Sequence, residues 1–287
     1  MNYALIAIGY MPEYLKVVIN SILSVDKDSK IYIFSDIKSE FKNVTNIHVN
    51  DLNSTESEYF KSQNIYENTI FEDNPLWITS ILRVFYLKDI INLLKIENFI
   101  HFDNDVLIYK PYEEISENFE NTKFNITQAS EKKFVFGYSY IDKKSPLNKI
   151  SSSILELVDY GIKHDWKFNN GKPYNEMDFL GAVHKKNNKL INPLPTLPYF
   201  SENIFDPSSY GQYLDGTHKQ PRKIISGSYV NLNEPIGIEL NSKRISCKFK
   251  DNKPIVKWKN KNYDLVNLHV HSKRFDKFLP NNYKNFI

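Results

Sequence analysis

The apolar residues of the first 50 positions fall into short runs and helical stripes. Residues 3–8 are a continuous apolar run, which is typical of a strand covered on both faces. Pro12 then opens a segment with apolar residues at helical spacing, namely Leu15, Val18, Ile19 and Ile22. Further strands are predicted over 30–34 and 46–49. This strand, helix, strand rhythm predicts a βαβ unit and a mostly parallel sheet.

The rest of the chain shows the same two patterns, short apolar runs and apolar residues at helical spacing. Residues 51–75 are polar and predict a loop with a short helix, and Pro75 opens a long helix that contains Arg83. Strands are expected over 99–102, 124–128, 134–141, 244–249, 255–259 and 263–270, and helices over 150–160 and from Asn175. The stretch 192–221 is rich in Pro, Gly and Tyr, which predicts irregular structure. The fold class is therefore α/β, a mixed and mostly parallel sheet flanked by helices, with a small C-terminal antiparallel β element.

Two carboxylates interrupt the apolar pattern at the end of one predicted strand. Asp103 and Asp105 stand between the apolar residues of 99–102 and 106–108. Asp is a poor strand former and is costly to bury, so this pair needs a partner. Magnesium and manganese suit carboxylate ligands and keep positions open for water and phosphate. The pair therefore predicts a place for a metal-bound diphosphate, with a solvated turn or a calcium loop as the alternative.

Composition sets outer limits on these hypotheses. Apolar residues make up 41% of the 287 residues and charged residues 25%, as in a soluble globular protein. A net charge of +3 is too small to argue for nucleic-acid binding. The single cysteine, Cys247, suits a reducing compartment, and residues 1–9 favour a strand over a signal peptide. A cytoplasmic protein without a transmembrane segment is expected, with peripheral membrane contact allowed.

The chain resembles nucleotide-sugar glycosyltransferases of the GT-A type, a Rossmann-like fold. The resemblance rests on the early βαβ unit, on Arg83 about twenty residues before Asp103-Asn104-Asp105, and on the late segment 268–273 (Leu-His-Val-His-Ser-Lys). Family 8 transferases and related capsule, lipopolysaccharide and viral glycan transferases share this order. The resemblance implies one catalytic domain over 1–287, with a nucleotide-binding half (1–111) and an acceptor-binding half (112–287).

The resemblance also implies roles for the motif residues. Asp103 would contact the ribose or the metal, and Asp105 would ligate Mn²⁺ or Mg²⁺ on the diphosphate of a UDP- or GDP-linked sugar. His271 would complete the metal site, with His269 as the alternative, and Lys273 would bind phosphate. The chain departs from the family 8 pattern here, because in that pattern the His and Lys are further apart with a Gly between them.

Several side chains have both a functional and an ordinary interpretation. His269 and His271 share one face of a strand, where they can be metal ligands or plain half-buried histidines. Arg83 can aim at the Asp pair or reach the surface beside its apolar stripe. Asp36, at the end of the second strand, can hydrogen-bond a nucleoside or cap a helix. Tyr10, after the first strand, can lie against the base.

Carboxylates in the second half are candidates for acceptor binding or for a catalytic base. Glu176 and Asp178 lie at a predicted helix start, where acids are also favourable without any catalytic role. Asp206 and Asp215 lie in the loop 205–218, which mixes acids with tyrosines as sugar sites do, although an ordered surface loop explains it too. An inverting enzyme would need such a base, and a retaining enzyme would not.

The predicted activity is metal-dependent transfer of a sugar, hexosyl or deoxyhexosyl, from a nucleoside diphosphate to a hydroxyl of a glycan acceptor. One alternative is a sugar nucleotidyltransferase, but Ile8-Gly-Tyr-Met-Pro12 lacks the Gly-rich, basic loop expected after its first strand. Another is a non-enzymatic, calcium-dependent glycan-binding protein. Such modules are usually antiparallel β, which the early βαβ pattern disfavours.

Overall fold

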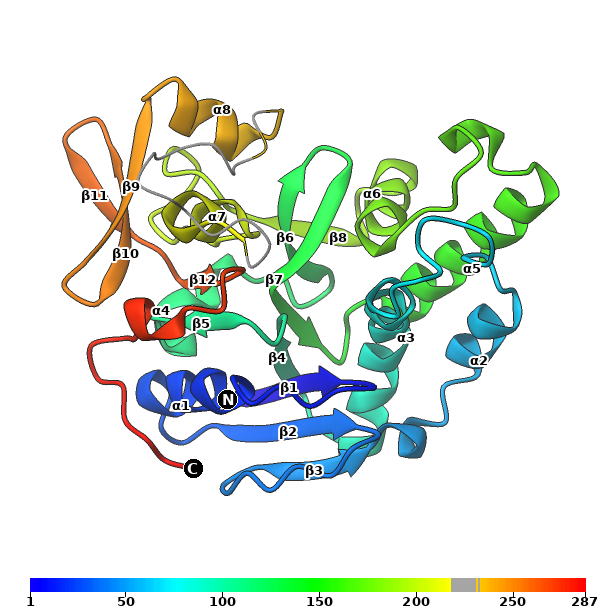
Figure 1. Ribbon diagram of the computed structural model, residues 1–287, viewed down its shortest axis with the longest axis horizontal. Helices are drawn as coiled ribbons and strands as arrows, with labels where there is room; N and C mark the ends of the chain where they lie inside the picture. The colour runs from blue at the N-terminus through cyan, green and yellow to red at the C-terminus, as the bar shows by residue number, and fades with distance from the viewer. Residues whose placement is uncertain (218–230, 232) are drawn as a thin grey trace.

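The computed structural model describes residues 1–217, 231 and 233–287 and is built around one seven-stranded sheet (Figure 1). The strand order is β3-β2-β1-β4-β7-β6-β8. Four neighbouring pairs are parallel, and β7 is antiparallel to both β4 and β6. The strands are β1 (Asn2–Ala7), β2 (Lys30–Ser35), β3 (Thr45–His48), β4 (Asn98–His101), β6 (Phe124–Ser130), β7 (Lys133–Asp142) and β8 (Ile191–Leu194).

Helices cover both faces of this sheet, and each face has its own apolar core. Against one face pack α1 (Leu15–Val25), α7 (Ser209–Asp215) and α8 (Pro235–Asn241), together with the smaller β elements. Against the other pack α2 (Thr55–Ser62), α3 (Leu76–Leu94), α5 (Leu147–Lys163) and α6 (Glu176–Lys186). The shorter helices are α4 (Tyr112–Ile115), η1 (Val49–Leu52), η2 (Ser116–Asn118), η3 (Lys167–Asn169) and η4 (Phe275–Phe278). Apolar residues on both faces explain why the strands read as continuous apolar runs.

Two smaller sheets complete the fold. β5 (Val106–Ile108) pairs antiparallel with β12 (Asn267–His269), so residues about 160 positions apart meet directly after β4. β9 (Ile245–Lys250), β10 (Lys253–Trp258) and β11 (Lys261–Asp264) form a three-stranded antiparallel sheet. The predicted fold class, a mostly parallel mixed sheet flanked by helices with a small C-terminal antiparallel element, is confirmed. No helix in the described part of the chain is long and apolar enough to cross a bilayer.

Two local predictions are wrong. The stretch 192–221 is not all irregular, because it contains most of β8 and the whole of α7, while 218–221 lie outside the described residues. Pro193 is compatible with β8 because β8 is an edge strand. The single strand expected over 263–270 is two strands, since β11 extends the small sheet and β12 joins β5.

Candidate functional site

The Asp pair lies in a tight turn at the carboxyl end of β4. The Asp103 backbone N–H donates to the Phe136 carbonyl at 2.7 Å, and the Val106 N–H donates to the Asp103 carbonyl at 3.1 Å. Between the two carboxylates, Asn104 Nδ2 donates to the Ile6 carbonyl of β1 at 2.8 Å. The turn is therefore fastened to the neighbouring strand, at the edge of an α/β sheet where ligands usually bind.

The β5–β12 pairing brings two histidines to Asp105. His269 lies opposite Val106, and the Val270 N–H donates to the Asp105 carbonyl at 2.8 Å. His269 Nε2 is 2.8 Å from Asp105 Oδ1, and the His271 ring stacks on the His269 ring with centroids 4.2 Å apart. The potential ligand atoms of Asp105, His269 and His271 all lie within 4.8 Å of one another. This is a set of one carboxylate and two imidazoles of the kind that binds first-row divalent metals.

The two histidines differ in charge because of their surroundings. Burial would lower the pKa of His269, but the Asp105 carboxylate outweighs it and raises that pKa to about 9. Burial and the neighbouring His269 lower the pKa of His271 to about 3, so its ring is neutral. The buried Nε2 atom of His271 has no hydrogen-bond partner within the described residues. A neutral, unpartnered imidazole nitrogen beside a carboxylate is what a metal ligand looks like before the metal binds.

Lys273 supplies a further positive charge to Asp105. Its Nζ forms an ion pair with Asp105 Oδ2 and lies 5.2 Å from the centre of the Tyr14 ring. Burial opposes ionisation of Asp105, yet His269 and Lys273 hold its pKa well below the usual range. Asp105 is therefore ionised, and its charge is balanced by groups that a cation could replace.

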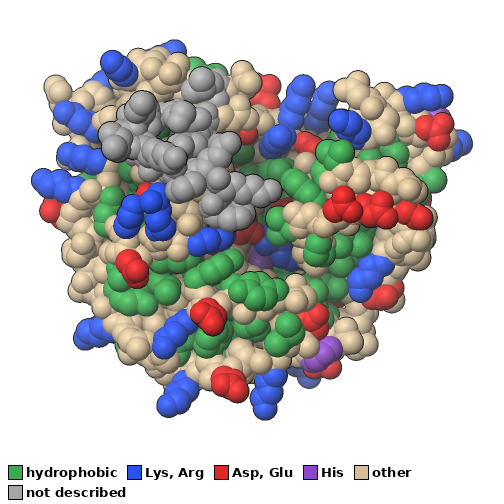
Figure 2. Space-filling model, viewed as in Figure 1, with side chains coloured by type: hydrophobic (Ala, Val, Ile, Leu, Met, Phe, Trp, Pro, Cys, Tyr) green, Lys and Arg blue, Asp and Glu red, His purple; other side chains and the backbone are tan. Residues whose placement is uncertain are grey.

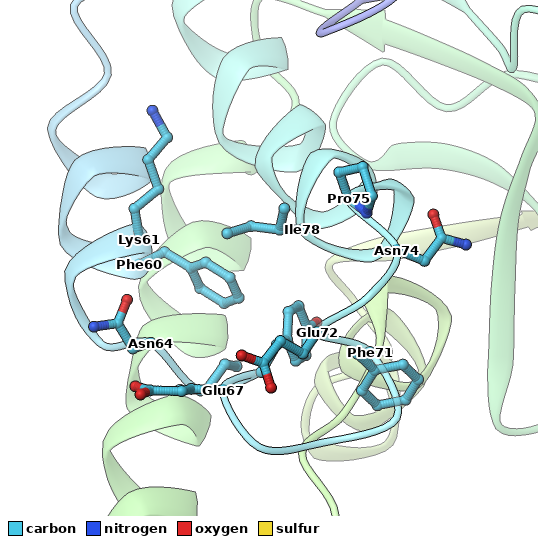
Figure 3. Close-up of a pocket in the computed structure, with 11 residues that line it drawn as sticks. Phe60, Lys61, Asn64, Glu67, Phe71, Glu72, Asn74, Pro75 and Ile78 are labelled. Atoms are coloured by element: carbon cyan, nitrogen blue, oxygen red, sulfur yellow. The ribbon is translucent and has the colours of Figure 1, made fainter.

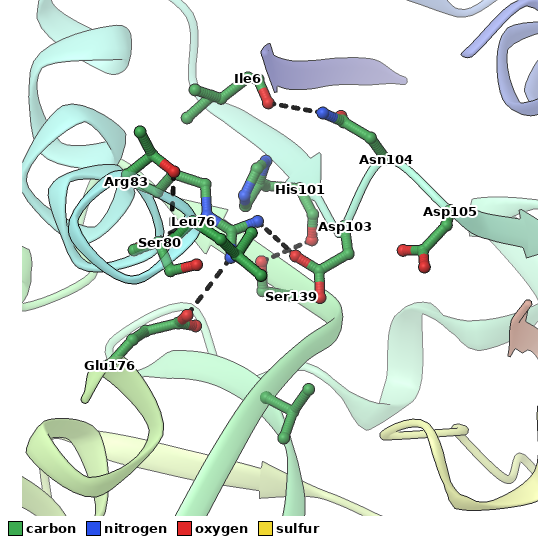
Figure 4. Close-up of polar contacts among 12 residues, drawn as sticks. Ile6, Leu76, Ser80, Arg83, His101, Asp103, Asn104, Asp105, Ser139 and Glu176 are labelled. Atoms are coloured by element: carbon green, nitrogen blue, oxygen red, sulfur yellow. Dashed lines mark hydrogen bonds and ion pairs between the residues drawn. The ribbon is translucent and has the colours of Figure 1, made fainter. Parts of the chain in front are cut away.

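Asp103 belongs to a second group of charged side chains, which includes residues of α3 and α6 (Figure 4). Arg83, from α3, forms an ion pair with Asp103 Oδ1, and its Nη2 is 3.3 Å from Glu176 Oε2 at the start of α6. The guanidinium group also lies over the Phe136 ring, 4.9 Å from its centre. Burial raises the pKa of Glu176, against the opposing effect of Arg83. Arg83 thus links the Asp pair to the one candidate acid on α6 that faces it.

Asp206 contacts the backbone of His269, but both of its carboxylate oxygens are fully occupied by hydrogen bonds. Its Oδ1 accepts the N–H groups of Ser208 and Tyr210 at 2.9 and 3.0 Å, and its Oδ2 accepts those of Gly211 and His269, each at 3.0 Å. Four donors fill the lone pairs of a carboxylate, and the side chain has no exposed area. Asp206 therefore fastens α7 to β12 and cannot receive a proton from a substrate hydroxyl without breaking this arrangement.

Asp215 is also occupied. Its carboxylate accepts hydrogen bonds from Ser272 Oγ at 2.7 Å and from Arg274 Nη2 at 2.6 Å, and Lys277 Nζ is 3.1 Å away. These contacts anchor the segment directly after His271. The structure gives Asp215 a role in holding this segment beside Asp105, which the sequence prediction of an acceptor contact did not include.

Three other candidates lie outside the cluster. Asp178 is half-buried, and burial raises its pKa while Lys133 opposes this, so its charged neighbour is on β7 and not in the Asp pair. Asp36 accepts the Gly9 N–H on both carboxylate oxygens, at 2.9 and 3.1 Å, which places it at the carboxyl ends of β1 and β2. Tyr10 follows Gly9 and is 66% exposed, free to meet a ligand there.

Two residues near the Asp pair were missed by the sequence analysis. Tyr14 packs its ring under Lys273, and burial raises its pKa far above the usual range. Asn104 holds the turn through Nδ2, while its buried Oδ1 has no hydrogen-bond partner in the described structure. The polar residue inside Asp-x-Asp was a usable signal for Asn104. No local signal exists for Tyr14, because its partner is 259 positions away.

Two cavities of the described structure lie away from the Asp pair. One of about 400 Å³ lies between α2 and the start of α3, with Phe60, Tyr66, Phe71 and Ile78 among its lining residues (Figure 3). Another of about 390 Å³ is lined by residues of β8 and the segment after it. Figure 2 shows instead an open hollow at the middle of one face, where histidine, acidic and basic side chains meet. We place the functional site at the charged cluster, because its carboxylates and imidazoles can bind a metal, whereas the two cavities are distinguished only by their volume.

Comparison with known proteins gives structural neighbours only. No protein-family model matches the chain, and no curated protein matches it. Mouse xyloside xylosyltransferase 1, in an apo form, matches at 14% identity and a TM-score of 0.48, over 68% of this chain and 86% of that one. The PaToxG glycosyltransferase matches at 18% identity and a TM-score of 0.41, over 65% and 69% of the two chains.

A third solved structure is the galactosyltransferase LgtC in complex with donor and acceptor sugar analogues. It matches at 18% identity and a TM-score of 0.41, over 64% of this chain and 70% of that one. All three are named as glycosyltransferases, the enzyme class that the sequence resembles. Identities and TM-scores this low do not define an activity, so the function of this chain has to be argued from its own residues.

Proposed function

We propose that this protein is a metal-dependent glycosyltransferase of the GT-A type, which transfers a sugar from a nucleoside diphosphate to a glycan hydroxyl. The observation that carries the proposal is the Asp105, His269 and His271 cluster at the carboxyl edge of the sheet. Its residues fit a resident Mn²⁺ or Mg²⁺, since a buried imidazole nitrogen of His271 has no partner and Asp105 is ionised.

The metal, when bound, would offset negative charge on the departing diphosphate. Asp105, His269 and His271 would hold it, and Asp103 lies close enough to join them, with Oδ2 3.7 Å from His269 Nε2. A cation at Asp105 would replace the charge now supplied by Lys273. The Lys273 ammonium group would then be available to a phosphate oxygen, as a point charge of the kind that often binds phosphate.

Arg83 and Glu176 would position Asp103 and the donor sugar. Arg83 is held on both sides by carboxylates, so its direction is fixed before any ligand arrives. Glu176 contacts Arg83, which in turn pairs with Asp103, and we assign this acid to the acceptor or the transferred sugar. Asp36 and Tyr10 would bind the nucleoside at the ends of β1 and β2. Asp206 and Asp215 would support the site without touching the substrate.

The proposed division into a nucleotide-binding half (1–111) and an acceptor-binding half (112–287) needs one refinement. Asp105 comes from the first half, while His269, His271 and Lys273 come from the second. The metal would therefore lie where the two halves meet. Binding of the donor would tie β12 to the turn after β4.

The experiment is a thermal shift screen with nucleoside diphosphates, including UDP and GDP, each with and without Mn²⁺. A ligand specific for the folded state stabilises by mass action, so one base should raise Tm only when the metal is present. Asp105→Asn loses the ion pairs to His269 and Lys273 and should melt below wild type. Measured from the variant's own Tm, the shift with metal and nucleotide should be abolished, and hydrolysis of the matching nucleotide sugar should be lost with it. Equal shifts in wild type and Asp105→Asn would overturn the proposal.

A further inference from the structure

The net positive charge of the chain is concentrated in its small C-terminal sheet. Residues 243–264, which contain β9, β10 and β11, hold eight basic and two acidic residues, a net charge of +6. The whole chain has a net charge of +3, so everything outside this segment sums to −3. Figure 2 shows Lys and Arg side chains projecting from the side of the molecule that carries this sheet. Such asymmetry points to a partner for the basic part.

The strand register places four lysines on one face of this sheet. Lys253 pairs with Lys250, Ile255 pairs with Lys248, and Lys257 lies two residues beyond Ile255 on the same strand. Directly opposite residues of antiparallel strands share a face, and residues two apart do as well. We call Lys248, Lys250, Lys253 and Lys257 the basic face. The residues between them point the other way, and Cys247, Val256 and Tyr263 belong to the apolar core.

Acidic side chains balance only part of the basic face. Lys253 Nζ is 2.5 Å from Asp264, and Lys250 Nζ is 3.8 Å from Asp251. Within the described residues, Lys248 and Lys257 form no ion pair at this distance, and both are exposed. Lys250 directly opposite Lys253 is a like-charge pair, which weakens a sheet. The arrangement therefore does not serve the stability of the sheet itself.

The basic face also lies outside the cores of the domain. Ile255 stands among these lysines and is only 6% exposed, yet it belongs to neither apolar core of the described structure. Long lysine stems can lie along apolar surface while their ammonium groups stay in water. Neither of the two cavities is lined by a lysine of this face. The surface therefore presents four ammonium groups around the buried Ile255.

We propose that the basic face docks the protein on an anionic membrane surface. Lysine without arginine suits diffuse attraction to lipid headgroups, because its compact, strongly hydrated charge has none of the planar fork that reads one phosphate bidentately. A groove lined with basic side chains would suit a polyanionic chain better than one face of a sheet does. Each lysine near an anionic bilayer contributes about fivefold in affinity, so four produce reversible, salt-sensitive attachment.

The test is vesicle co-sedimentation of the full chain. Wild type should bind vesicles of phosphatidylcholine with about a third phosphatidylglycerol, should bind pure phosphatidylcholine weakly, and should be released by added salt. Lys248→Glu with Lys257→Glu should weaken binding to the anionic vesicles roughly 25-fold or more. Lys149→Glu with Lys163→Glu, on exposed positions of α5, removes the same charge elsewhere and should keep most of the binding.

Equal loss in the two variants would show that net charge and not the basic face matters, and would overturn the proposal. So would wild type that binds both vesicles equally, or that binds heparin but not anionic vesicles. Both variants should keep the wild-type Tm and the shift with Mn²⁺ and nucleoside diphosphate. That second readout separates failure of membrane docking from failure of the proposed enzymatic function.

Discussion

Replacing Asp206 with Asn tests whether this carboxylate is a support for His269 or a catalytic group. The change keeps the size and shape of the side chain but puts an NH₂ group where one oxygen now accepts two backbone N–H groups. The four present hydrogen bonds are 2.9–3.0 Å long and come from the start of α7 and from His269. In the variant, two buried backbone N–H groups would face the side-chain NH₂ group, which is itself a donor and cannot accept their hydrogen bonds.

An unsatisfied buried N–H costs about 1–3 kcal/mol, so two cost about 2–6 kcal/mol. Some of this is recovered, because burial raises the pKa of Asp206 and a neutral amide avoids the cost of burying a charge. We therefore expect a loss of about 2–4 kcal/mol in the free energy of unfolding. At roughly 2–4 °C per kcal/mol for a chain of this size, Tm should fall by about 5–15 °C.

The assay is scanning calorimetry of Asp206→Asn beside wild type, with the exposed Asp28→Asn as the control. The control should melt within about 1 °C of wild type, since exposed substitutions usually have small effects. If Asp206→Asn also melted like wild type and yet lost all turnover, the carboxylate would belong to the chemistry. The structural interpretation of the four hydrogen bonds would then be refuted.

Three further predictions follow from burial and close contact. His101 is buried, its Nδ1 contacts the Ala4 carbonyl, and burial lowers its pKa to about 3. As pH falls, the His101 ring therefore takes up a proton in the unfolded chain before it does so in the folded protein. The His101 contribution to stability is present above pH 6.5 and should fall by about 1.4 kcal/mol per pH unit down to pH 3. Urea unfolding at several pH values measures this slope, which should be smaller in His101→Gln. His269 has a pKa of about 9 without metal, so Mg²⁺ affinity measured by calorimetry should rise about tenfold per pH unit from pH 7 and level off near pH 9; a flat profile would exclude His269 as a ligand. A Cβ on Gly211 would stand 1.9 Å from the His269 carbonyl oxygen, so Gly211→Ala should lower Tm and weaken metal binding, whereas Gln212→Ala should do neither.

The fold class could be predicted because the strands of the central sheet are buried on both faces. Runs such as 3–8 and 30–34 need no long-range information to be read as strands. The split of 263–270 could not be predicted in the same way. Leu265 and Val266, which lie between the two strands, are as apolar as residues inside a strand. Only the presence of β5 decides that the chain leaves one sheet and joins another there.

The site was predictable where the chemistry is local. Asp103 and Asp105 stand out because carboxylates between apolar strands need partners, and His269 and His271 because they share a face. The roles of Asp206 and Asp215 were not accessible, since an acid filled by backbone N–H groups and one free for a substrate look the same in a sequence. The link from Arg83 to Glu176 also depends on packing, as α3 and α6 meet only in the folded chain.

The most direct measurement of the central claim is an anomalous diffraction map from crystals grown with Mn²⁺ and a nucleoside diphosphate. We predict one strong peak between the Asp105 carboxylate and the imidazole rings of His269 and His271, with the diphosphate beside it and Lys273 turned toward a phosphate oxygen. A peak elsewhere, or a diphosphate bound with no metal at this cluster, would contradict the account.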